Sequence, residues 1–167
     1  SAYDLTTEAE ARQAVREQVA RKVAFIKVWV DDRNGTVKKT PPAIYRAVID
    51  EAHKLHTRVI AHVYYLDDAK DLARAGVDAF AHMVRDREMD DESLALIKQH
   101  KVLTMPNLGI AEARTHAEPA LWLDDPLFRQ VTPAVLVERM RAAYSGRTPA
   151  TVEAARKNYG LMRRNLA

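Results

Sequence analysis

The hydrophobic residues of this 167-residue chain fall into two alternating patterns: short continuous apolar runs, and longer stretches with a helical repeat. Continuous runs rich in β-branched residues are typical of parallel strands that are covered on both faces. They predict strands at residues 23–30, 58–63, 77–82 and 101–106. Apolar positions three or four residues apart predict helices at residues 8–22, 43–56, 67–75, 90–100, 133–144 and 149–165.

Strands that alternate with helices in this way predict an α/β fold built from parallel βα repeats. Such sheets either stay open and doubly wound or close into an eight-stranded barrel. A complete (β/α)8 TIM barrel takes about 250 residues, so the chain is expected to form an open sheet or part of a barrel. Residues 107–132 have weak periodicity, and we expect a long functional loop with short helical pieces there.

Composition and charge predict one soluble globular domain over residues 1–167. Apolar residues make up 47% of the chain and charged residues 29%, and the net charge of +3 forms no basic stripe of the kind that nucleic acid requires. The chain has no cysteine, which excludes disulfides and thiolate metal sites. No apolar run approaches the roughly 20 residues that cross a bilayer. We expect no membrane partner, and a location in the cytoplasm or outside it, with a signal peptide removed.

Two histidines end neighbouring predicted strands. His62 closes the run Arg58–His62, His82 closes Val77–His82, and each follows an alanine. Ligands of parallel α/β folds bind at the carboxyl ends of the strands. A single histidine there is more often a hydrogen-bonded core residue, but two in matching positions favour a shared metal site, since neutral imidazole is a common zinc ligand.

Lys27 interrupts the first apolar run, and we expect it to be buried there. Burying an ammonium group is costly, so the amine is expected to be neutral. A neutral lysine can form a Schiff base with a carbonyl substrate, or a carbamate that bridges two metal ions. Alternatively, the stem of Lys27 packs in the sheet while its amine reaches water. The sequence leaves these readings open.

Other polar residues also follow predicted strand ends, where loops of parallel folds usually contact substrate. These candidate substrate-binding residues are Tyr64, Tyr65, Arg85 and Asn107.

Several strings occur in an order that resembles the amidohydrolase superfamily, and within it the imidazolonepropionase-like and Xaa-Pro dipeptidase-like (prolidase-type) hydrolases. The resemblance extends from about residue 7 to residue 107. Its strings are Phe25-Ile-Lys-Val28, Glu51-Ala-His53, Val59-Ile-Ala-His62, Ala75-Gly-Val-Asp-Ala-Phe-Ala-His82 and Met105-Pro106.

The resemblance implies a metal-dependent (β/α)8 barrel of which this chain covers about strands four to seven. Lys27 matches the carboxylated lysine of the fourth strand, and His62 and His82 match the metal-binding histidines of the fifth and sixth. By this resemblance Lys27 is both catalytic and a metal ligand. Two zinc ions bridged by hydroxide would attack the carbonyl of an amide or dipeptide substrate, because the metals lower the pKa of water and polarise the carbonyl.

Two parts of the family pattern have no counterpart in this sequence: the His-x-His pair of the first strand and the aspartate of the eighth. We therefore expect a partial barrel that is inactive or nearly so by itself. Because part of a barrel has open edges, it should self-associate or contact the rest of the barrel.

Two other functions remain open. The chain could be a non-catalytic α/β fragment that acts only through association. A calorimetric zinc titration that shows no heat of specific binding would favour this function. It could also contribute a Schiff-base lysine to an aldolase-like barrel, which borohydride trapping would reveal. The sequence does not predict the identity of the substrate.

Overall fold

The computed structural model describes residues 4–167. Its internal contacts divide the chain into two compact units. The first extends to Pro106 and includes Arg164–Ala167, and the second comprises Asn107–Arg163. The expectation of one domain over residues 1–167 stays a prediction.

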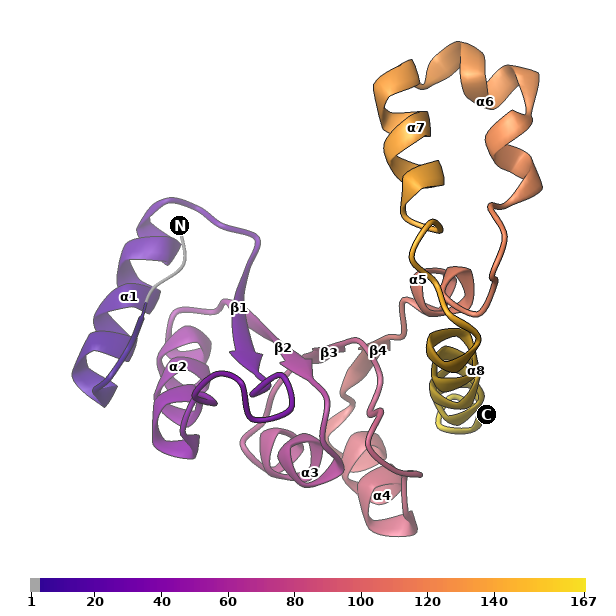
Figure 1. The fold of residues 1–167 in the computed structure, drawn as a ribbon. Coiled ribbons are helices and arrows are strands. Elements are labelled where there is room, and N and C mark those ends of the chain that lie inside the picture. Colours follow the sequence, from indigo (N-terminus) through magenta and orange to yellow (C-terminus); the bar gives the residue numbers. More distant parts are fainter. Residues whose placement is uncertain (1–3) are drawn as a thin grey trace. The chain divides into compact units, whose positions relative to one another are not determined.

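The first unit alternates helices with parallel strands, as predicted. Its helices are α1 (Glu8–Ala20), α2 (Pro42–Lys54), α3 (Leu66–Arg74) and α4 (Asp91–His100). Its strands are β1 (Phe25–Val30), β2 (Arg58–Val63), β3 (Ala79–Ala81) and β4 (Leu103–Met105). In the described part of the chain these form one four-stranded sheet, with the order β1-β2-β3-β4 and every pair parallel (Figure 1). The predicted α/β class and the parallel βα repeats are confirmed.

The order of the strands decides between the two expected architectures. A doubly wound sheet reverses its strand order at a switch point, whereas here each strand lies next to the one before it in the sequence. Because βαβ connections are right-handed, this order carries the helices to one face, and α2, α3 and α4 lie along the same side of the sheet in Figure 1. The winding is that of a barrel segment.

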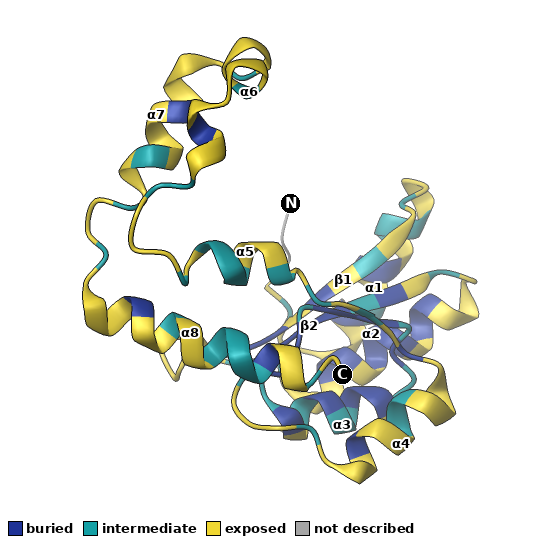
Figure 2. Cartoon of the chain, turned by 90° about the vertical axis from the view of Figure 1, so that its right-hand side faces the viewer, coloured by how far each residue is buried: buried dark blue, intermediate teal, exposed yellow. Residues whose placement is uncertain are grey.

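The helix-covered face of the sheet carries the hydrophobic core. Val28, Ala61 and Phe80 share one row of the register and are buried. Ile49 of α2 and Leu72 of α3 belong to the same buried cluster. Figure 2 shows the buried residues concentrated where the strands meet these helices.

The opposite face of the sheet is open along its edge strands β1 and β4, whereas His62, Ala79 and Ala81 of its middle strands are buried. Lys27 and Trp29 alternate with the buried residues of β1 and are exposed, and so are Phe25, Leu103 and Met105. The prediction that Lys27 is buried is therefore wrong for this structure. The apolar run indicated cover on both faces, but only one face of β1 packs against helices.

The second unit consists of helices joined by loops, with no strand among its described residues. It contains α5 (Leu108–Ala113), the 3₁₀ helix η1 (Leu121–Asp124), α6 (Pro126–Val131), α7 (Ala134–Ala142) and nearly all of α8 (Pro149–Arg164). The short helices within residues 107–132 confirm the predicted helical pieces, and a functional role of that segment stays a prediction. Across residues 4–167, no helix combines the length and the apolar character needed to span a membrane.

Candidate metal centre

The structure brings the two predicted histidines together on the open face of the sheet. Their ring centroids lie 4.7 Å apart with an interplanar angle of 66°. His62 pairs with Ala81, so strict alternation would turn the next residue, His82, toward the helices. Instead, β3 ends at Ala81 and His82 adopts a positive φ of 86°. Its N–H donates to the carbonyl oxygen of Met105 at 2.9 Å, which holds this backbone turn in place.

Asp31 directly follows β1 and fixes the orientation of His62. Its Oδ2 lies 2.9 Å from Nε2 of His62, and both side chains are buried, at 8% and 6% exposure. Its Oδ1 accepts the backbone N–H of Arg33 at 2.8 Å. Asp31 was not among the residues expected in the site. Its position at a strand end, which identified His62, was the available signal.

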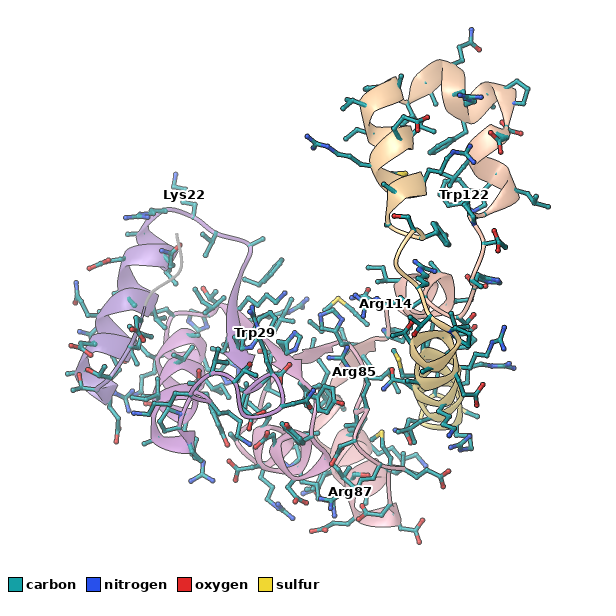
Figure 3. All side chains as sticks on the ribbon, viewed as in Figure 1. Lys22, Trp29, Arg85, Arg87, Arg114 and Trp122 are labelled. Carbon is teal, nitrogen blue, oxygen red and sulfur yellow. The ribbon has the colours of Figure 1, made fainter. Side chains whose placement is uncertain are left out.

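Trp29 forms the second constraint on His62. The two rings stack with centroids 3.7 Å apart and an interplanar angle of 11°. The indole N–H donates to the backbone oxygen of Asp31 at 3.1 Å. Trp29, Asp31 and His62 therefore form one connected group at the ends of β1 and β2, with Trp29 labelled in Figure 3. Trp29 was expected only as an apolar strand residue.

Both imidazoles are held neutral near pH 7. Burial lowers the pKa of His62, and the hydrogen bond to Asp31 offsets part of that effect. Burial also lowers the pKa of His82 to about 4, with further electrostatic contributions from His62, Arg85 and Lys27. Lys27 also contributes to the lowered pKa of His62. Neutral imidazole is the form that binds metal ions.

The residues present fit part of a metal site. Nδ1 of His62 is buried and has no hydrogen-bond partner among the described residues, so its lone pair could bind a metal. A catalytic zinc site takes three protein ligands, and within residues 4–167 no group of three or more His, Cys, Asp or Glu side chains is placed to hold an ion. The two imidazoles would need a further ligand, which Lys27 could supply only as a carbamate.

Three of the four expected substrate-binding residues lie together after β2 and β3. The guanidinium of Arg85 lies 5.0 Å from the ring centroid of Tyr64, and Tyr64 and Tyr65 meet edge to face at 4.8 Å. The hydroxyl of Tyr65 donates to Asp32 at 2.6 Å, which raises the pKa of Tyr65 to about 12. Figure 3 labels Arg85. Asn107, the fourth expected residue, belongs to the second unit.

A hollow of about 690 Å³ lies beside β1, and its lining includes Lys27 and Trp29. It also reaches α1 and the segment of residues 38–41. His62 and His82 do not line it. The hollow therefore adjoins the histidine pair and does not enclose it.

No protein-family model matches the chain. An uncharacterised protein of Mycobacterium tuberculosis is 31% identical to it over 123 residues, which is 67% of this chain and 32% of that protein. The chain thus spans about a third of the length of the relatives it matches.

Solved structures share the fold over nearly the whole chain. A prolidase complexed with N-methylphosphonate-L-proline superposes with a TM-score of 0.64 and 19% identity, covering 97% of this chain and 35% of the prolidase. An amidohydrolase superposes with a TM-score of 0.60 and 20% identity, covering 96% of this chain and 35% of the other. Prolidases and amidohydrolases are the proteins that the resemblance predicted. The chain therefore has the fold of about a third of such a hydrolase, which is a partial (β/α)8 barrel.

Proposed function

We propose that this chain is part of a metal-dependent hydrolase of the amidohydrolase superfamily that cleaves the C–N bond of an amide or a dipeptide. The observation that carries the proposal is the contact between His62 and His82, two neutral imidazoles from neighbouring strand ends, one with a buried nitrogen that no described residue binds. The fold shared with a prolidase and an amidohydrolase supports it.

In this proposal His62 and His82 hold zinc, and Lys27 completes the site as a carbamate. When bound, zinc lowers the pKa of water and polarises a carbonyl group. Lys27 lies on the same face as His62, with its strand neighbour Ile60 two residues before that histidine. Carbamate formation needs a neutral amine, which cover over the open face would favour by excluding water.

Arg85, Tyr64 and Tyr65 would bind the substrate. The guanidinium of Arg85 is suited to an anionic group, such as the carboxylate of a dipeptide. Its contact with the ring of Tyr64 fixes the two side chains relative to each other. Asn107 stays a further candidate on the sequence alone.

We also propose that the rest of a barrel covers the open face and the edges of this sheet. Phe25 and Leu103 expose 47% and 65% of their surface there, although both belong to strands of the sheet. The relatives are more than twice as long as this chain, which supports cover from additional strands of the same protein. Self-association of the chain is the alternative, and analytical ultracentrifugation of the chain across a concentration series separates the two.

The test uses the longer protein that the proposal requires. Zinc content and hydrolysis of a dipeptide panel that includes Xaa-Pro substrates are measured for the wild type and for Lys27→Ala, His62→Ala and His82→Ala. We expect each variant to lose both zinc and activity. His53→Ala is the control, because His53 is exposed and pairs with Asp78 away from the site. Unchanged zinc and hydrolysis in the three variants would overturn the proposal.

A further inference from the structure

We propose that Asp31 is a positioning residue that holds His62 as the Nε2–H tautomer and so keeps Nδ1 free for the metal. That the ligand of Nδ1 is a metal rests on the proposed function. The tautomer of His62 does not, because it can be measured without metal.

The carboxylate of Asp31 is itself held in place. One oxygen accepts the backbone N–H of Arg33 and the other faces Nε2 of His62, so both oxygens are engaged. A carboxylate facing an imidazole nitrogen stabilises the tautomer with the proton on that nitrogen. The other ring nitrogen, Nδ1, must then carry a lone pair, and it is the one without a partner among the described residues.

Trp29 restricts the ring of His62 in a second way. A parallel ring at 3.7 Å limits rotation of the imidazole out of its plane, while Asp31 fixes rotation within the plane. The indole N–H also anchors the backbone of Asp31. Together these contacts fix both which nitrogen of His62 is available and where it points. Carboxylates that orient metal-binding histidines in this way typically change metal affinity by about 10–100-fold when they are removed.

The chain contains a matched pair for comparison. Asp78 also faces Nε2 of a histidine, His53, at 2.9 Å, and it also accepts a backbone N–H, from Val59 at 2.7 Å. That pair is exposed, at 42% for the histidine and 31% for the aspartate. Asp31→Ala and Asp78→Ala therefore delete the same two kinds of hydrogen bond, one beside the candidate metal site and one away from it.

The experiment records ¹⁵N chemical shifts of the histidine ring nitrogens in the metal-free chain, and then the affinity of the longer protein for zinc by calorimetry. We expect His62 of the wild type to be protonated on Nε2 alone. In Asp31→Ala we expect a mixture of the two tautomers and zinc affinity reduced about 10–100-fold. Asp78→Ala should leave the His62 tautomer and the zinc affinity unchanged, although it removes hydrogen bonds of the same kinds.

A proton on Nδ1 of His62 in the wild type would overturn the proposal, even if Asp31→Ala does not fold. Equal zinc affinities of the wild type and Asp31→Ala would also overturn it, while leaving the metal site itself supported. If the wild type bound no zinc, the proposed function would lose its support, and the tautomer measurement would still decide the role of Asp31.

Discussion

The backbone at His82 predicts an unusual order of stability between two variants. His82→Ala removes the imidazole but keeps Cβ, whereas His82→Gly removes both. At an ordinary position in a folded chain, glycine is less stable than alanine by about 0.5–1 kcal/mol, because it loses more conformational freedom on folding. His82 has a φ of 86°, where a Cβ is strained. We therefore expect the glycine variant to be the more stable of the two.

The size of the difference follows from the strain. Left-handed backbone costs a residue with a Cβ about 1–2 kcal/mol, which exceeds the entropic disadvantage of glycine. The net expectation is that His82→Gly is more stable than His82→Ala by about 1 kcal/mol. Gly76 provides an internal calibration, since its φ is 87° and a Cβ there would meet only Cε1 of His53, at 3.8 Å. Gly76→Ala should thus lose about 1 kcal/mol through backbone strain alone.

The assay is urea unfolding followed by circular dichroism, with differences in the free energy of unfolding taken from the midpoints at a common slope. Zinc titration of the same variants should show that both lose the ion, because both lack the imidazole. If His82→Gly were the less stable variant by the ordinary 0.5–1 kcal/mol, the backbone at this position would not be strained, and the reasoning would be refuted.

Three further predictions concern the first unit. Lys70 lowers the pKa of Asp90 to about 2 through a hydrogen bond. The wild type should therefore melt at a higher temperature than Asp90→Asn, with the full difference above pH 3.8 and none once the pH has fallen through about 2. A difference in melting temperature that does not depend on pH would contradict this. Leu72→Ala should lose about 2–5 kcal/mol in urea unfolding, because Leu72 is fully buried, whereas Leu94→Ala, at a half-exposed site, should change stability by less than about 1 kcal/mol. Thr7→Ala should lose about 1 kcal/mol in the same assay, since it breaks the capping box of α1, and a result equal to the wild type would rule out that cap.

The sequence predicted the elements well where an apolar run and its boundaries agreed. Strand β2 occupies residues 58–63, as predicted, where the apolar run lies between Thr57 and Tyr64. Strands β3 and β4 are shorter than predicted, since residues such as Val77 and His82 extend the apolar pattern beyond the hydrogen-bonded ladder. Hydrophobic pattern reports burial, and the ladder also requires an extended backbone that His82 does not have.

The candidate site was predicted in part. Their positions at neighbouring strand ends predicted that His62 and His82 lie close together, but the positive φ that turns His82 toward His62 was not predicted. The stacking of Trp29 on His62 depends on the register of β1 against β2, which the sequence does not state. The contact of Asp31 depends on the path of the chain just after β1. The burial of Lys27 was predicted wrongly, because an apolar run does not indicate which of the two faces of its strand is covered.

Three features of the open face are unfavourable, and what would remove each of them indicates whether the face is a metal site. The exposed apolar surface of Phe25 and Leu103 would be buried by any protein that covers this face. It is therefore equally compatible with a non-catalytic fragment that only associates. Nδ1 of His62, which has no partner among the described residues, would gain one from a metal or from a hydrogen-bond donor. The positive φ of His82 would be relieved by neither, because it is strain within the backbone. It turns the imidazole of His82 toward His62, whereas strict alternation would turn it toward the helices. Six other described non-glycine residues also have a positive φ, so the strain at His82 is informative because it accompanies the contact between two imidazoles. The backbone of His82 is therefore the observation that favours a metal site over the fragment that only associates.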